Sequence, residues 1–191
     1  SVATTTTWTP AYADFSTYVG ALASGNYPFT TTAEPITIGD FNFYSSTDGS
    51  LRLHETSVPL YAINYNGTSV KNDSSDTPVV FIEGTSGQVD PKIRNAAGGV
   101  TRYVSIPFAG TTDPVKVKVT YSNASGSCVN GQIALVDQNT KAWKVASACG
   151  TANSTIETTI ADATVTELFI LMTRSGDGGG GIRIWNIEIT K

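Results

Sequence analysis

Apolar and polar residues alternate along several short segments of the chain, which is the pattern of β-strands that bury one face. Residues 115–121 show the pattern without interruption, because three valines and Tyr121 alternate with Lys116, Lys118 and a threonine. We predict that the valines and Tyr121 point into a core and that the lysines point outward.

Other segments predict further short strands. They comprise residues 36–44, 51–54, 79–82, 102–108, 154–160, 165–173 and 182–191. Turn residues recur at short intervals, and no segment predicts a long helix. The pattern therefore favours an all-β protein, an antiparallel β-sandwich of the jelly-roll type. Because the chain has no sequence repeat and no linker, we expect residues 1–191 to form a single domain.

Residues 1–30 are rich in threonine and lack a regular pattern. Their apolar anchors are Trp8, Tyr12, Phe15 and Tyr18. We interpret this segment as an irregular arm that packs on the sandwich and caps its core, and the alternative is a platform for a ligand.

The two cysteines, Cys128 and Cys149, flank a segment that is expected to form a hairpin. If Gln138 and Asn139 form a two-residue turn, Cys128 lies opposite Cys149 at a separation that a disulfide can bridge. A single bulge would change this register. We predict one disulfide, Cys128–Cys149, and the alternative is a pair of free buried thiols.

The composition points to an extracellular protein. Charged residues make up only 15% of the chain, against about 25% in a typical globular protein. Serine, threonine, glycine and asparagine take their place, so we expect a secreted or cell-surface protein. The net charge of −4 argues against nucleic-acid binding, and the chain has no apolar run long enough to span a membrane. Because it begins at Ser1 without a signal peptide, we expect a processed or excised piece.

Signatures of an enzyme are largely absent. His54 is the only histidine, and no nucleophile motif accompanies it, so an ordinary surface histidine is favoured over a serine triad. One histidine and two cysteines that are expected to be paired exclude a histidine-rich metal site. No spacing pairs two carboxylates as glycosidase chemistry requires. We expect no catalytic residue, no metal ligand and no required cofactor.

A structural calcium ion is the one cofactor for which donors exist. Calcium needs several converging oxygen atoms. The available donors are Asp40, Asp48, Asp177, Asn186 and Glu188. Because they are scattered along the sequence, they form no recognisable calcium motif.

Aromatic and basic residues carry the binding prediction. A sugar ring presents an apolar C–H face that stacks on an aromatic plane, and a guanidinium holds the carboxylate of a uronic acid. The predicted carbohydrate-binding residues are Lys92, Arg94, Arg102, Tyr103, Trp143, Arg174, Arg183 and Trp185. The alternatives are that the tryptophans belong to a core and that the cations only balance nearby acids. Trp185 is expected to share a strand face with Arg183, Ile187 and Ile189.

Four segments resemble a known class of domain, namely residues 101–108, 115–126, 132–137 and 181–190. They are similar to the non-catalytic jelly-roll modules attached to secreted polysaccharide-degrading enzymes, particularly those of the pectate-lyase type. The resemblance implies binding of a plant or algal polysaccharide and a covalently linked catalytic module. It assigns no binding residue in this chain. Where such modules carry a calcium-binding carboxylate near the final strand, this chain has Asn186-Ile187-Glu188.

Three functions are compatible with the sequence. The first is a carbohydrate-binding module for a polysaccharide, such as a pectin-like polymer that contains uronic acid. The second is an adhesion or cell-surface domain that binds a protein or a glycan. The third is a small jelly-roll polysaccharide lyase that uses tyrosine as a base and a cation to neutralise a uronate. The candidate residues for the lyase are Tyr61, Tyr65, Tyr103, Lys92 and Arg102.

Overall fold

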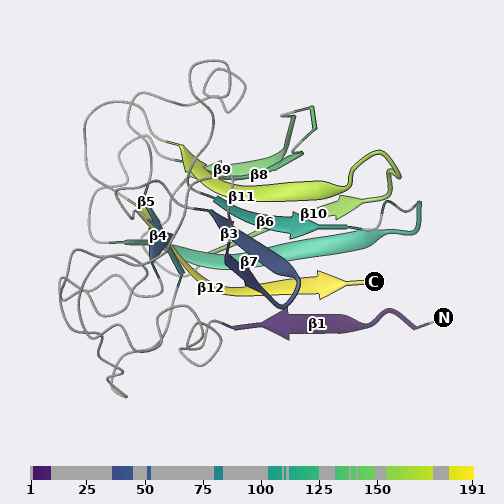
Figure 1. Ribbon diagram of the computed structural model, residues 1–191, viewed down its shortest axis with the longest axis horizontal. Coiled ribbons are helices and arrows are strands. Elements are labelled where there is room, and N and C mark those ends of the chain that lie inside the picture. The colour runs from purple at the N-terminus through teal and green to yellow at the C-terminus, as the bar shows by residue number, and fades with distance from the viewer. Residues whose placement is uncertain are drawn as a thin grey trace.

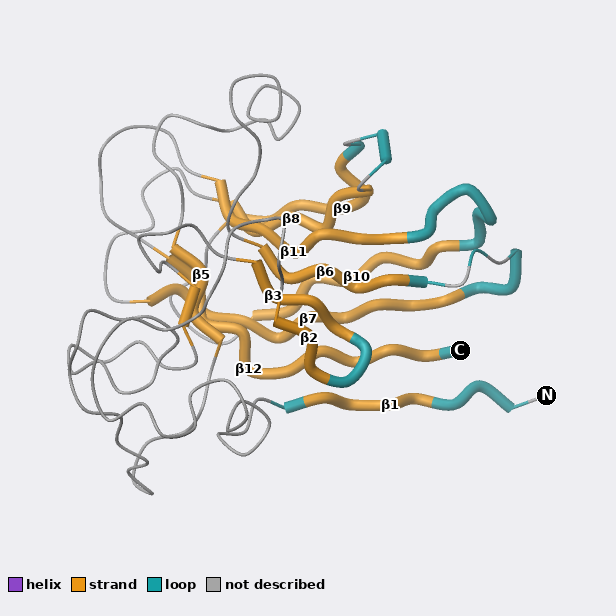
Figure 2. Tube along the Cα trace, in the orientation of Figure 1, coloured by secondary structure: helices purple, strands orange, loops and turns teal. Residues whose placement is uncertain are grey.

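The computed structural model describes the chain in twelve stretches. They are residues 2–9, 36–44, 51–52, 80–83, 103–108, 110, 112–124, 132–137, 139–140, 142–148, 154–173 and 181–191. In these residues every regular element is a β-strand (Figure 1, Figure 2). None of them forms a helix long and apolar enough to cross a membrane.

The strands form two antiparallel sheets. They are β1 (Thr5–Trp8), β2 (Ile36–Ile38), β3 (Phe41–Tyr44), β4 (Leu51–Arg52), β5 (Val80–Glu83), β6 (Tyr103–Pro107), β7 (Val115–Ala124), β8 (Gln132–Asp137), β9 (Trp143–Ala148), β10 (Ser154–Ile160), β11 (Glu167–Thr173) and β12 (Gly181–Thr190). One sheet, which we call the β7–β12 sheet, has the order β10-β7-β12-β5-β4, and β1 also pairs with β12. The other, the β8–β11 sheet, has the order β2-β3-β6-β11-β8-β9.

One continuous core lies between the two sheets, since its buried residues come from both. Val117, Val119 and Tyr121 of β7 are buried there, while Lys116 is exposed, as the alternation predicts. The hydroxyl of Tyr121 donates a 3.1 Å hydrogen bond to the carbonyl oxygen of Ala148 on β9, so this buried phenol links the sheets. The predicted all-β sandwich is confirmed.

The alternation predicted for the segments that form β6 and β11 is also confirmed. Val104 and Ile106 of β6 and Leu168 and Ile170 of β11 have no exposed surface. Pro107 is the last residue of β6, a position where the missing N–H interrupts little of the ladder.

Strand β1 forms within the arm that was expected to be irregular. Thr5 pairs with Thr190 and Trp8 with Ile187 on β12, and Trp8 packs against the core. The other anchors of the arm, Tyr12, Phe15 and Tyr18, lie outside the described residues. Figure 1 shows β1 beside β12 at one edge of the structure.

The connection between β8 and β9 is longer than the two-residue turn that the sequence predicted. The backbone N–H of Asp137 donates a 2.9 Å hydrogen bond to the carbonyl oxygen of Ala142, so four residues rather than two separate the facing ends of the strands. The carboxylate of Asp137 accepts hydrogen bonds from the backbone N–H of Asn139 at 3.0 Å and from the hydroxyl of Thr140 at 2.9 Å. These bonds stabilise the longer turn, since aspartate readily bonds to groups two and three residues further on.

The longer turn and a register shift between Leu135 and Val136 together change the register of the hairpin. Gln132 pairs with Ala148 rather than with Val145, so the predicted register, which places Cys128 opposite Cys149, is wrong by three residues. Both cysteines lie outside the described residues, and their disulfide stays a prediction that rests on composition and compartment.

We expect the disulfide Cys128–Cys149 to be present when the chain folds in an oxidising compartment. Under denaturing conditions without reductant, iodoacetamide should alkylate neither cysteine, whereas after reduction it should alkylate both, as mass spectrometry would show. Full alkylation without reductant would instead establish two free thiols.

Gly110 leaves no room for a side chain. A Cβ at this position would lie 2.3 Å from the carbonyl oxygen of Ala163. This carbonyl belongs to a turn in which the carboxylate of Asp162 accepts hydrogen bonds from the backbone N–H and the hydroxyl of Thr164, at 2.9 Å and 2.7 Å. Because backbone atoms cannot yield as a side-chain tip can, Gly110→Ala should lower the free energy of unfolding by about 1–3 kcal/mol.

Urea unfolding of the Gly110→Ala variant measures this effect. The matched control is Ala161→Ser at an exposed position, which should stay within about 0.5 kcal/mol of the unmodified chain. Equal unfolding midpoints for the two variants would show that the Ala163 turn moves freely.

Candidate functional site

A β-bulge in β12 shapes the outer face of the β7–β12 sheet. The register of β12 against β7 shifts between Ile184 and Asn186, so Trp185 is an additional residue. Ile184 and Ile187 are both fully buried in the core although they are three positions apart. The bulge keeps both isoleucines inside and leaves Trp185 and Asn186 on the outer face.

This bulge overturns the expectation that Trp185 shares a strand face with Ile187 and Ile189. Ile187 lies in the core and Ile189 packs against it, whereas Trp185 bonds to an outward-facing residue of β7. Sequence periodicity missed the change of phase because it assumed unbroken alternation along the last strand. The available signal was the pair Ile184 and Ile187, two apolar residues whose spacing does not fit one strand face.

Ser122 lies at the centre of the group on this outer face. The indole Nε1–H of Trp185 donates a 2.9 Å hydrogen bond to Ser122 Oγ. Arg183 is the cross-strand partner of the same serine, and directly paired residues point to the same side of a sheet. Ser122 is buried, whereas Trp185, Arg183 and Asn186 are half-buried. We call Ser122, Arg183, Trp185 and Asn186 the Ser122 cluster.

The guanidinium of Arg183 is partly withdrawn from water. Its burial lowers the pKa of Arg183 from the ordinary value, because desolvation disfavours the charged form. Arginine nevertheless keeps its charge in proteins. A cation that has lost part of its hydration gains more from an anionic ligand than a fully solvated one, since the local dielectric constant is lower.

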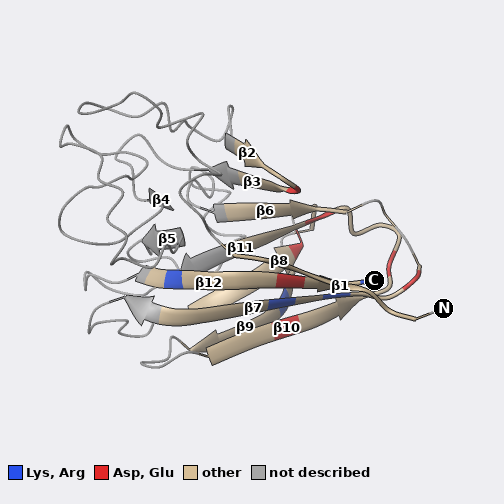
Figure 3. Cartoon of the chain, turned by 90° about the horizontal axis from the view of Figure 1, so that it is seen from below, with Lys and Arg blue, Asp and Glu red and all other residues tan. Residues whose placement is uncertain are grey.

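The surroundings of the Ser122 cluster are polar and sparsely charged. Asn186 Oδ1 is buried and accepts a hydrogen bond from none of the described residues. Further along the same face, Lys118 Nζ lies 3.6 Å from Glu188 Oε2, a partly exposed ion pair that contributes little to stability. In the described residues, charged positions are spread along β7, β10 and β12 rather than gathered in one patch (Figure 3).

Trp143 lies on the opposite outer face of the sandwich. A register shift between Leu135 and Val136 pairs Val136 with Trp143. It places Trp143 on the outer side of the sheet, where the alternation along β8 already places Val136. There Trp143 packs against a second apolar cluster that contains Val136, Ala134 and Phe169. Trp143 and Trp185 therefore cannot line a single site.

The structure brings together two of the eight predicted carbohydrate-binding residues, Arg183 and Trp185. Tyr103 begins β6 in the other sheet, with its backbone paired to Tyr44. Lys92, Arg94, Arg102 and Arg174 lie outside the described residues, as do the lyase candidates Tyr61 and Tyr65 and the histidine His54. Sequence reasoning did not single out Ser122, whose role depends on a cross-strand pairing that no local pattern reveals.

Three of the five candidate calcium donors, Asp40, Asn186 and Glu188, lie in the described part of the chain, and the calcium ion stays a prediction. Asp40 lies in the turn between β2 and β3, and Glu188 pairs with Lys118 on the outer face. Asp48 and Asp177 lie outside the described residues. No group of three or more acidic, histidine or cysteine side chains that could hold a metal ion occurs among the residues that are described.

Comparisons with known proteins find similar solved structures but no match by sequence. No protein-family model and no curated protein matches the sequence. The K1 cleaved adhesin domain of Lys-gingipain from Porphyromonas gingivalis W83 is similar over 97% of each chain, at 9% identity and a TM-score of 0.43. An Arthrobacter globiformis T6 isomalto-dextranase complexed with panose is similar over 98% of this chain and 32% of the enzyme, at 13% identity and a TM-score of 0.28. Scores this low assign neither an activity nor a ligand.

The bond between Trp185 and Ser122 should contribute to stability. Ser122→Ala leaves the half-buried indole N–H without its acceptor, which should lower the free energy of unfolding by about 1 kcal/mol in urea titrations. Thr155→Ala, at an exposed position on the same sheet, is the matched control and should have little effect. A loss no larger than that of the control would mean that water replaces the serine at no cost.

Proposed function

We propose that this chain is a non-catalytic carbohydrate-binding module and that the Ser122 cluster binds the sugar. The observation that carries the proposal is the placement of an indole and a guanidinium beside the same serine on one polar sheet face. An aromatic plane and a forked cation are the two groups that recognise an acidic sugar best. The expected partner is a polysaccharide that contains uronic acid, of the pectin type.

The indole of Trp185 is suited to stacking because its polar edge is already satisfied. Its N–H is bonded to Ser122, so the ring is held in one orientation and loses little freedom when a sugar binds. The C–H face of a pyranose would pack on the exposed part of the ring. Sugar hydroxyl groups would accept hydrogen bonds from the amide N–H groups of Asn186, which lies next to the indole in the bulge.

The guanidinium of Arg183 supplies the preference for an acidic polymer. Two parallel N–H donors match the two oxygens of a uronate carboxylate, and partial desolvation strengthens that attraction. The chain itself carries a net charge of −4, so overall attraction cannot hold a polyanion and a local cation has to do so.

The remaining parts of the proposal follow from this role. A module of this kind would act outside the cell, as the low content of charged residues also favours. It would hold a covalently linked catalytic module near its polymer and thereby raise the local substrate concentration. No catalytic residue and no metal are needed for such binding.

Affinity electrophoresis against pectins, alginate, xylan and β-glucans tests the proposal. We expect retardation by a uronic-acid polymer, weakened about threefold to tenfold by Trp185→Ala and by Arg183→Met. Arg183→Lys should recover only part of the loss, because a point charge does not reproduce the fork. Retardation should also fall as salt is added, since screening weakens the ionic contact.

Trp143→Ala is the matched control, because it removes a tryptophan from the opposite outer face. Retardation that depends on Trp143 and not on Trp185 would move the site to the other sheet. Rising absorbance from unsaturated products would replace the binding module with a lyase. No retardation by any of these polymers would contradict carbohydrate binding for them and favour a protein-binding adhesion domain.

A further inference from the structure

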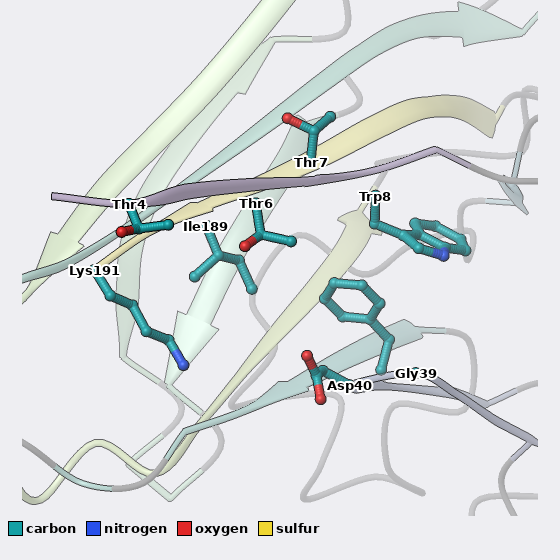
Figure 4. A pocket seen from close by; sticks show the side chains of 9 residues that line it. Thr4, Thr6, Thr7, Trp8, Gly39, Asp40, Ile189 and Lys191 are labelled. Carbon is teal, nitrogen blue, oxygen red and sulfur yellow. The ribbon is translucent and has the colours of Figure 1, made fainter.

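A cleft opens at the edge of the sandwich, between β1, the end of β12 and the turn that joins β2 to β3 (Figure 4). It consists of two adjoining cavities of about 250 Å³ and 320 Å³. Both are lined by Gly39, Asp40, Ile189 and Lys191. None of these residues belongs to the Ser122 cluster, so the cleft is a separate feature.

The smaller cavity has an aromatic wall. Trp8 of β1 and Phe41 of β3 lie with their ring centroids 5.3 Å apart and their planes tilted by 56°. Phe41 is buried and anchored in the core, whereas Trp8 and Ile189 are only partly buried and present apolar surface to the cavity. Such a wall favours a branched or aromatic side chain of modest size.

The larger cavity is polar. Two residues of opposite charge, Asp40 and Lys191, line both cavities. Thr37 and Asn42 line the larger cavity, together with Asp40 and Lys191. Within the described part of the chain no ion pair involves Asp40 or Lys191. Figure 4 shows these two side chains reaching toward the cleft from different elements, Asp40 from the β2–β3 turn and Lys191 from the end of β12. A carboxylate and an ammonium are thus both available to one ligand.

Backbone contacts fix the elements that carry the two charges. Lys191 and Thr4 exchange two backbone hydrogen bonds of 2.8 Å and 3.0 Å, so the end of β12 is tied to β1. Ile38 pairs with Phe41 across a two-residue turn whose first residue, Gly39, has a φ of 57°. Glycine adopts this left-handed conformation without strain, and the turn presents Asp40 at the cleft. Fixed backbones reduce the entropy that binding has to overcome.

We propose that this cleft binds a free α-amino acid with an apolar side chain. The side chain packs against Trp8, Phe41 and Ile189. The α-ammonium pairs with the carboxylate of Asp40, and the α-carboxylate pairs with the ammonium of Lys191. A zwitterion that carries one apolar group matches an apolar cavity, a polar cavity and a pair of opposite charges at their junction. A neutral sugar offers neither charge, and a residue within a peptide has lost both.

Isothermal titration calorimetry of the chain with L-leucine and L-phenylalanine tests the proposal. Because both charges are recognised, N-acetyl-L-leucine, which lacks the ammonium, and L-leucinamide, which lacks the carboxylate, should each bind about tenfold more weakly than L-leucine. Equal binding of the three leucine compounds would overturn the proposal, as would the absence of saturable binding of both free amino acids.

Substitutions locate the site and assign each charge. Asp40→Asn should abolish the preference for L-leucine over N-acetyl-L-leucine, and Lys191→Met should abolish the preference over L-leucinamide. Both positions are exposed, so the fold should survive. The matched controls are Glu157→Gln and Lys144→Met, which remove exposed charges elsewhere and should leave both preferences intact. Preferences that survive Asp40→Asn and Lys191→Met would place the amino acid outside the cleft.

The cleft binds its amino acid independently of carbohydrate binding at the Ser122 cluster. Trp185→Ala should weaken retardation by a polysaccharide and leave the calorimetry with L-leucine unchanged. Asp40→Asn should weaken the binding of L-leucine and leave the retardation by a polysaccharide unchanged. Loss of both activities in either variant would mean that the two sites are not separate, and the amino-acid proposal would be wrong as stated.

Discussion

One additional residue in β12 determines what the β7–β12 sheet presents on each face. A strand without it would carry Trp185 and Ile187 on the same side, and it could not bury both Ile184 and Ile187. The bulge at Trp185 resolves this conflict in favour of the core, where both isoleucines are fully buried. The indole is displaced outward as a consequence, and the hydrogen bond to Ser122 then fixes it there.

An additional residue has the same effect in the β8–β11 sheet. The register shift between β8 and β9 keeps Val145 against the core and turns Trp143 outward against Val136. The two tryptophans therefore end on opposite outer faces. A sequence pattern can identify both as candidates, but it cannot tell that they serve different surfaces, because that outcome depends on where each extra residue is inserted.

The sequence predicted the fold wherever a strict two-residue period applied. Alternating valines predicted the buried face of β7, because burial alone sets the pattern there. The prediction from sequence failed where a single additional residue changes the phase of the alternation. Two more residues than expected separate Asp137 from its partner Ala142, and the register shift between Leu135 and Val136 adds a third, so every pair of that hairpin is displaced. Ser122 escaped notice because its partners are distant in sequence.

Strand β12 supports both proposed sites without sharing a side chain between them. Glu188 points to the outer face while its neighbour Ile189 lines the cleft, since successive residues of a strand point to opposite sides. Coupling between the sites would require the strand itself to move. The pairing of β12 with β7 runs from Gly181 to Thr190, and β1 holds the opposite edge of its second half, so such movement would break backbone bonds on both sides. The geometry therefore favours two sites that act independently.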